Sequence, residues 1–136
     1  DFKMPSYATN GSAGMDLFAC INEEIIIKPG HIENIPTGIA IHIDNKNIGG
    51  FIFSRSGLST KYGISLVNAV GVMVDPDYTG EIKCPIINHS NIQYKIKPGD
   101  RIAQIIFMPF YSANFILTSE LEKTGRGSGG FGSTGR

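Results

Sequence analysis

Short stretches in which apolar and polar residues alternate recur along this chain of 136 residues. Isoleucine occupies every second position over residues 39–43, and comparable apolar runs lie at 24–28, 51–53, 82–86 and 92–96. β-Branched residues dominate these runs, while glycine, proline and asparagine separate them. Because a period of two is typical of a strand with one buried face, the pattern predicts an all-β fold built as a sandwich, jelly roll or barrel.

Helical signals are weak by comparison. We predict at most one short helix, over residues 57–62, with Ser56 or Ser59 as its cap. The composition changes only near the end, where residues 125–136 read GRGSGGFGSTGR. We therefore predict one domain over residues 1–121, followed by a flexible C-terminal arm over residues 122–136.

Composition limits the classes of function. Twelve basic residues balance twelve acidic ones, so a general nucleic-acid binder or a binder of acidic membranes is not expected. An anionic substrate would need a local cluster of positive charge. Charged residues make up only 18% of the chain, which is low for a monomer and indicates that partner subunits cover some surface.

Two further features bear on location. Cys20 and Cys84 lack the spacing of a metal site, which favours structural thiols in a reducing compartment. No apolar stretch approaches the length of a membrane span, and residues 1–5 do not resemble a signal peptide. We therefore expect a cytoplasmic protein.

Five segments carry candidate chemistry, and each also has a simpler interpretation. Residues 13–17 include Asp16, which a glycine turn entering a strand would explain. Residues 54–59 place Arg55, Ser56 and Gly57 together. These three residues could surround a phosphate with a cation, a hydroxyl and backbone N–H groups, or they could simply join a strand to a helix.

The third segment spans residues 68–83 and contains Asp75-Pro76-Asp77-Tyr78 followed by Gly80. This is a turn signature. It also brings two carboxylates and a tyrosine to one tip, where a carboxylate could act as a general base or assist a metal ion. Gly71 would allow the backbone to approach a flat ligand closely.

The last two segments lie nearer the C-terminus. Residues 98–104 predict a hairpin turn that leads into a core strand, in which the amide of Gln104 requires a hydrogen-bond partner. The arm contains Arg126 and Phe131, which a plain disordered tail would not need. An arginine can neutralise a terminal phosphate and a phenylalanine can stack on a base, so the arm could become ordered on a ligand. It lacks the Gly-Lys-Ser/Thr of a Walker A loop.

Taken in order, these five segments resemble the five motifs of the trimeric dUTPase family, over almost the whole chain. The resemblance implies a jelly-roll-like distorted β-barrel that assembles as a homotrimer, with active sites between subunits and the arm of one chain closing over a neighbouring site. It also implies Mg²⁺-dependent hydrolysis of dUTP to dUMP and pyrophosphate. This reaction limits uracil incorporation into DNA and supplies dUMP for thymidylate synthesis.

The resemblance also implies roles for individual residues. Asp75 would be the general base that activates the attacking water, and Asp16 would hold a water of the metal ion. The substrate-binding residues implied on the domain are Arg55, Ser56, Gly57, Asn68, Gly71, Tyr78 and Gln104. Those implied on the arm are Arg126, Phe131, Gly132, Ser133 and Thr134.

Base selection would rest on the hairpin that begins at Asn68. Its backbone would read the polar edge of uracil, and Tyr78 would pack on the deoxyribose and exclude a 2′-hydroxyl. The stretch from Asn68 to Asp75 is one residue longer than the common family pattern. Because one extra residue reverses the facing of a strand unless a bulge absorbs it, we predict a bulge near Gly71.

Two other functions are alternatives to this resemblance. A dCTP deaminase shares the fold, but the position of its catalytic glutamate is occupied here by Pro85, which cannot do that chemistry. A catalytically silent β-module that senses nucleotides or binds proteins is the other alternative, and the presence of Asp75, Gln104 and Arg126 argues against it.

Overall fold

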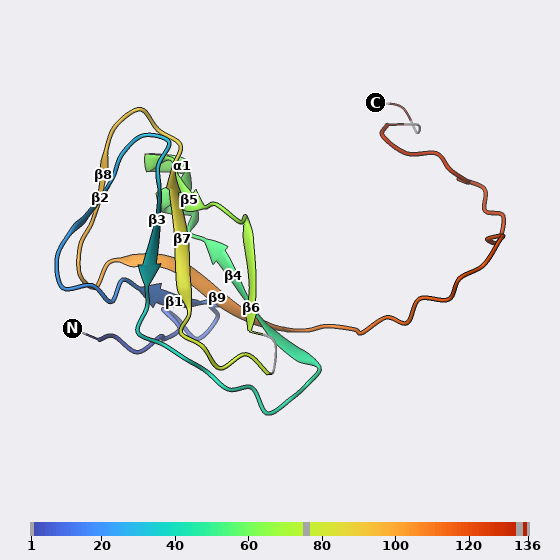
Figure 1. The fold of residues 1–136 in the computed structure, drawn as a ribbon, viewed down its shortest axis with the longest axis horizontal. Coiled ribbons are helices and arrows are strands. Elements are labelled where there is room, and N and C mark those ends of the chain that lie inside the picture. Colours follow the sequence, from blue (N-terminus) through green and yellow to red (C-terminus); the bar gives the residue numbers. More distant parts are fainter. Residues whose placement is uncertain (1, 75–76, 133–134, 136) are drawn as a thin grey trace.

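The computed structural model describes residues 2–74, 77–132 and 135. These residues form an almost entirely β structure with one short helix (Figure 1). Its elements are β1 (Met15–Phe18), β2 (Ile25–Ile27), β3 (Ile32–Pro36), β4 (Ile48–Ser54), α1 (Ser56–Tyr62), β5 (Ile64–Leu66), β6 (Val70–Val74), β7 (Lys83–Asn88), β8 (Tyr94–Ile96) and β9 (Arg101–Pro109). The prediction of an all-β fold with at most one helix is confirmed.

The described strands form three antiparallel sheets that are not closed into a continuous barrel. The largest has the order β1-β9-β4-β6, a second pairs β2 with β8, and the third has the order β3-β7-β5. In the first sheet, strands from the two ends of the sequence become neighbours, because β9 pairs with both β1 and β4. This pairing brings three of the five chemical segments together.

The core consists of the inward-facing apolar side chains that the alternation predicted. Along β7, Cys84, Ile86 and Asn88 are buried, and the residues between them are partly exposed. The buried apolar residues are Leu17, Ala19, Ile27, Ile35, Ile39, Ile52, Ile64, Leu66, Ile82, Cys84, Ile86, Ile96, Ile102, Ala103 and Ile105. Both cysteines are free thiols, and burial raises the pKa of the Cys84 thiol to about 12.

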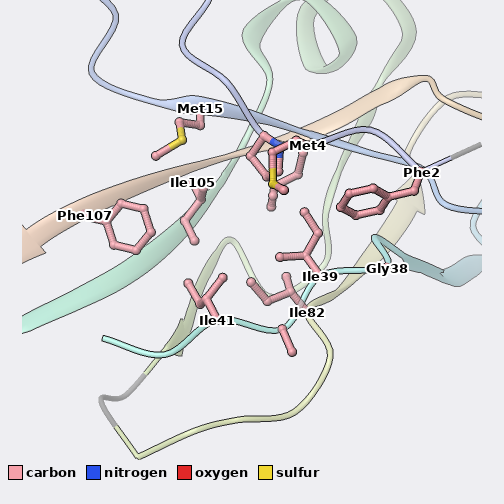
Figure 2. Close-up of a pocket in the computed structure, with 12 residues that line it drawn as sticks. Phe2, Met4, Met15, Gly38, Ile39, Ile41, Ile82, Ile105 and Phe107 are labelled. Carbon is pink, nitrogen blue, oxygen red and sulfur yellow. The ribbon is translucent and has the colours of Figure 1, made fainter. Parts of the chain in front are cut away.

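The alternating run at residues 39–43 is not a strand in this chain, contrary to the prediction. Its side chains do alternate, because Ile39 is buried and Ile41 and Ile43 are partly buried, while residues 40 and 42 are exposed. The run borders an apolar cavity of about 300 Å³ in which Ile39 and Ile41 face Met4, Ile105 and Phe107 (Figure 2). The run therefore has the facing of a strand, but it is part of none of the described strands.

The chain beyond β9 is organised differently from the sheets. β9 ends at Pro109, and the described residues after it run away from the folded body (Figure 1). Several large apolar side chains in this region are almost fully exposed, namely Tyr111, Phe115, Ile116, Leu117, Leu121 and Phe131. The last strand therefore ends twelve residues before the predicted domain boundary at residue 121, and that boundary stays a prediction.

β6 contains the additional residue that the sequence indicated. Phe51 of β4 pairs with Val72, but Gly50 pairs with Val74, so the register skips Met73. A bulge is thus confirmed, two positions beyond the predicted site at Gly71.

Among the described residues, no helix has the length and apolar character needed to cross a membrane.

Candidate active site

A cavity of about 470 Å³ lies where β1, β9 and the start of α1 meet. Its lining residues are Ala8, Ser12, Ala13, Gly14, Asp16, Arg55, Ser56, Gly57, Arg101, Gln104 and Ile106. Two guanidinium groups and one carboxylate give this lining a net positive charge, although the whole chain is neutral. The cavity is therefore the kind of local basic cluster that an anionic ligand requires.

Asp16 is the centre of the charged lining. Its Oδ1 lies 3.2 Å from Nε of Arg55, and its Oδ2 lies 3.2 Å from a terminal nitrogen of Arg101. Arg55 also donates a hydrogen bond of 3.3 Å to the backbone oxygen of Arg101. Asp16 is a strand residue of β1 rather than the turn residue of the simpler interpretation. These contacts tie β1, β9 and the β4–α1 junction to one carboxylate.

Gln104 lies directly opposite Asp16 in the pairing of β9 with β1. Its side-chain amide donates to the backbone oxygen of Ser54 at 3.3 Å, which supplies the partner that the sequence required. Gly14 makes room for it, because a Cβ at Gly14 would lie 3.3 Å from Oε1 of Gln104 and 3.2 Å from Ile106. A side chain at this position would therefore press on Gln104 and Ile106 beside the cavity.

The start of α1 forms another wall of the cavity. Arg55 is at the N-cap position and makes no side-chain capping bond, so the expected capping by Ser56 or Ser59 is wrong. Ser56 and Gly57 instead provide the first residues of the helix. A Cβ at Gly57 would meet no atom within 4 Å, so packing does not explain this glycine. The space that it leaves adjoins the arginines.

The hairpin residues lie elsewhere in the structure. Val67, Asn68 and Ala69 form the turn between β5 and β6, and Ala69 has a left-handed φ of 60°. The hydroxyl of Tyr78 donates to the backbone oxygen of Glu81 at 3.1 Å, and the ring covers Gly80, where a Cβ would lie 2.5 Å from that hydroxyl.

Tyr78 borders a second cavity of about 430 Å³, together with Asn34, Glu81, Lys83 and Pro85. Among the residues that the structure describes, the linings of this cavity and of the cavity around Asp16 have no member in common. In this single chain the hairpin residues and the basic cavity are therefore separate features.

The sequence was compared with known proteins. Residues 1–135 match the family model described as dUTPase. This chain belongs to the dUTPase family. It is 51% identical over 133 residues to the deoxyuridine 5'-triphosphate nucleotidohydrolase of Desulfitobacterium hafniense, an alignment that covers 98% of this chain and 87% of the relative.

Solved structures of the dUTPase family share the fold. A point mutant of the phage 80alpha dUTPase superposes with a TM-score of 0.85 at 26% identity, covering 97% of this chain and 92% of that one. The Staphylococcus bacteriophage 80alpha dUTPase with dUpNHpp gives a TM-score of 0.83 at 25% identity, covering 99% and 93%. The jelly-roll-like character predicted from the sequence agrees with these neighbours.

Of the residues that the dUTPase resemblance implied, the structure brings one group together. Asp16, Arg55, Ser56, Gly57 and Gln104 all line the basic cavity. The remaining domain residues are on the β5–β6 hairpin or beyond it: Asn68, Gly71 and Tyr78. The arm residues Arg126, Phe131 and Gly132 lie in the extended region after β9, and three further predicted residues fall outside the described residues: Asp75, Ser133 and Thr134.

Arg101 is a charged residue of the cavity lining to which the sequence assigned no role. It stands directly after the turn Pro98-Gly99-Asp100, within the segment that the sequence predicts to be a hairpin turn leading into a core strand. The one sequence signal that could have pointed to Arg101 is its positive charge at the start of that strand. Its contact with Asp16 depends on the pairing of two strands that are far apart in the sequence.

The lining of the basic cavity fits a hydrated Mg²⁺ rather than a metal ion enclosed by protein ligands. Among the described residues, no group of three His, Cys, Asp or Glu side chains could hold a metal ion. Asp16 is the carboxylate of the cavity, and each of its oxygens already faces a guanidinium. Mg²⁺ keeps several waters and often takes its remaining ligands from substrate phosphates, which suits a single outer carboxylate.

Proposed function

We propose that this protein hydrolyses dUTP to dUMP and pyrophosphate in the basic cavity around Asp16. The observation that carries the proposal is the convergence of Arg55, Ser56, Gly57 and Gln104 on one cavity in a chain that belongs to the dUTPase family. The reaction removes dUTP, which limits uracil incorporation into DNA, and it supplies dUMP for thymidylate synthesis.

The phosphates bind at the start of α1 in this proposal. The backbone N–H groups of Ser56 and Gly57 and the hydroxyl of Ser56 donate to phosphate oxygens, and Arg55 neutralises their charge. Support comes from the open space at Gly57, which lets a phosphate approach the backbone. Gln104 stands beside the same space and contacts a phosphate or a water bound to it.

The chemical step requires an in-line attack of water on the α-phosphorus. Asp75 orients this water and accepts its proton, while Arg126 of the arm meets the γ-phosphate. Mg²⁺, when bound, would supply charge neutralisation at the triphosphate, and Asp16 would be the residue that holds one of its waters. Positioning and neutralisation then account for most of the acceleration, since phosphoryl transfer needs little covalent chemistry from the protein.

Selection of uracil rests on the hairpin between β5 and β6. The turn at Asn68 and Ala69 presents backbone groups that pair with the polar edge of uracil, and Gly71 allows close approach. Cytosine carries an amino group where uracil has a carbonyl, so a fixed backbone donor would be left unpaired. Tyr78 packs on the deoxyribose, and its hydrogen bond to the backbone oxygen of Glu81 holds its ring in place for that contact.

The working enzyme in this proposal is a homotrimer in which the arm of one chain covers the site of another. Phe131 stacks on the uracil there, and Gly132, Ser133 and Thr134 add phosphate contacts. Two observations support assembly. The run at residues 39–43 has the facing of a strand, and Phe115, Ile116 and Leu117 are exposed after β9. The number three comes from the family resemblance.

A nucleotide panel tests the reaction. The purified protein is incubated with Mg²⁺ and dUTP, dCTP, dTTP or UTP, and the release of pyrophosphate is measured. We expect rapid release from dUTP alone. Ammonia from dCTP would indicate a deaminase instead, and no pyrophosphate from any of the four would indicate a silent binding module. The expected cytoplasmic location stays a prediction.

The role of Asp75 is tested by replacing it with asparagine. We expect Asp75→Asn to bind the analogue dUpNHpp with nearly wild-type affinity while kcat for dUTP falls by ~10³-fold, because a positioned general base contributes on this order. Asp77→Asn is the matched control, since Asp77 is the second carboxylate of the same Asp-Pro-Asp sequence, and it should retain most activity. Near-normal turnover by Asp75→Asn would remove this residue from the mechanism.

A further inference from the structure

A bulge in β9 decides which side of the sheet Arg101 faces. Asp16 of β1 pairs with Gln104 and Leu17 pairs with Ala103, but Phe18 pairs with Arg101, so the register skips Ile102. Residues three positions apart on a regular strand face opposite sides. The additional residue at 102 reverses this relation, so that Arg101 and Gln104 face the same side.

Burial along β9 agrees with the shifted register. Ile102 and Ala103 are consecutive, yet both are buried, at 3% and 0% exposure. Arg101 and Gln104 flank this pair and both line the basic cavity. Without the bulge, Arg101 would point toward the opposite face of the sheet.

Because the bulge turns Arg101 toward the cavity, Asp16 lies between two guanidinium groups. Arg55 holds one carboxylate oxygen and Arg101 holds the other, each at 3.2 Å. A rotation of the Asp16 side chain would break at least one of these contacts. The Asp16 side chain is only 17% exposed, whereas that of Arg101 is 51% exposed. Solvent screens a pair with one exposed partner, so its contribution to stability is small.

We propose that Arg101 is a positioning residue of the active site. It fixes the orientation of the Asp16 carboxylate so that this carboxylate can receive a hydrogen bond from a water of the magnesium–triphosphate complex. The inference rests on the proposed function, because it concerns the same cavity and the same ligand. Arg101 acts through Asp16 in this account and does not itself touch the phosphates.

A double-mutant cycle tests this dependence. Binding of dUpNHpp with Mg²⁺ is measured by calorimetry for the wild type, Arg101→Gln, Asp16→Asn and the double variant. We expect Arg101→Gln to weaken binding by about tenfold in the wild-type background and by less than about twofold beside Asp16→Asn, since coupled residues are not additive. An equal loss in both backgrounds overturns the proposal, because it would mean direct phosphate contact or a general structural effect.

Two further measurements distinguish a positioning role of Arg101 from a structural role. In EDTA, Arg101→Gln should bind dUpNHpp as the wild type does, because the effect passes through the metal-bound water. Arg101→Lys keeps a charged donor and should recover most of the affinity. A loss of equal size in EDTA overturns the proposal. If Arg101→Gln does not fold, Arg101→Met replaces it in both backgrounds and is judged by the same criterion of additivity.

The outcomes also distinguish this inference from the proposed function. A wild-type protein that neither hydrolyses dUTP nor binds dUpNHpp contradicts the proposed function and, with it, this inference. A wild-type protein that turns over dUTP while the cycle is additive contradicts the role of Arg101 alone.

Discussion

Arg55 and Arg126 are both proposed to meet phosphates, yet the chain holds them in different ways. Arg55 contacts Asp16 on β1 and the backbone oxygen of Arg101 on β9, so residues distant in sequence fix its position. Arg126 is exposed, and its Nε donates at 2.8 Å to Gly129, only three residues away. The cavity around Asp16 is built by tertiary contacts, whereas the hydrogen bonds of the described arm residues 122–132 close local turns.

This difference separates two contributions to binding. A side chain that packing already holds in place loses little conformational freedom when a ligand arrives, so most of its interaction energy is retained. The arm must give up backbone freedom on binding, at a cost of roughly 1–2 kcal/mol for each residue that becomes fixed. The folded cavity thus supplies recognition in advance, while the arm contributes only after it becomes ordered.

Of the changes predicted in this comparison, removal of the arm should have the largest effect, and the effect is on activity. We expect truncation after Gly125 to lower kcat/KM for dUTP by about 100-fold or more, because Arg126 and Phe131 are lost and water can enter the site. Light scattering should show the same assembly as the full-length protein, since residues 111–121 are retained. Unchanged turnover would mean that the folded cavity is sufficient and that the arm is only a tail.

The cavity around Asp16 keeps its shape only while the core of the folded domain is intact. Replacing the buried Asn88 tests how far the stability of that core depends on one polar network. Its fully buried amide donates to the backbone oxygens of Ile27 and Ile92 at 2.9 and 2.7 Å, and its oxygen accepts from Ser90. We expect Asn88→Ala to lower the free energy of unfolding by about 2–4 kcal/mol in urea titrations, because several buried polar groups lose their partner.

Asn91 is the matched control for this measurement, since it is exposed on the following turn. Asn91→Ala should change the free energy of unfolding by less than about 0.5 kcal/mol. Equal stability of Asn88→Ala and the wild type would mean that the sheets do not depend on this network.

A change of pH is expected to have a smaller effect on the free energy of unfolding. Burial raises the pKa of Cys84 from an ordinary value of 9.0 to about 12. Above pH 9 the unfolded chain releases this proton while the folded chain retains it, so stability falls as pH rises. We expect a loss on the order of 1 kcal/mol between pH 7 and pH 10 from this thiol. Cys84→Ala should show a shallower decline over the same range, and parallel profiles would contradict the assignment.

The alternation of apolar and polar residues correctly predicted those strands that also find a neighbouring strand to pair with. The runs containing Ile27, Cys84 and Ile96 are strands whose apolar side chains are buried, as their alternation indicated. The run at 39–43 shows the limit of this reasoning. Its inward side chains follow the alternation, but a strand also requires a neighbour with which to share backbone hydrogen bonds, and periodicity does not report on neighbours.

The candidate site could be predicted in part for a similar reason. Asp16, Arg55, Ser56, Gly57 and Gln104 were identified from their motifs, and the fold brings them to one cavity. Arg101 was assigned no role, because its segment was interpreted as a hairpin turn that leads into a core strand. Counting along a regular strand would also place Arg101 on the face opposite Gln104. Only the pairing of β9 with β1 reveals the skipped residue that changes its direction.

The skipped residue in β6 has a consequence for how related proteins can be found. A strand that absorbs an insertion through a local distortion can gain one residue while the elements on either side keep their places. The interval from the turn asparagine to the following aspartate is then free to differ by one residue between proteins that perform the same reaction. Sequence searches that require a fixed interval there would overlook such members, and a gap of one position should be allowed.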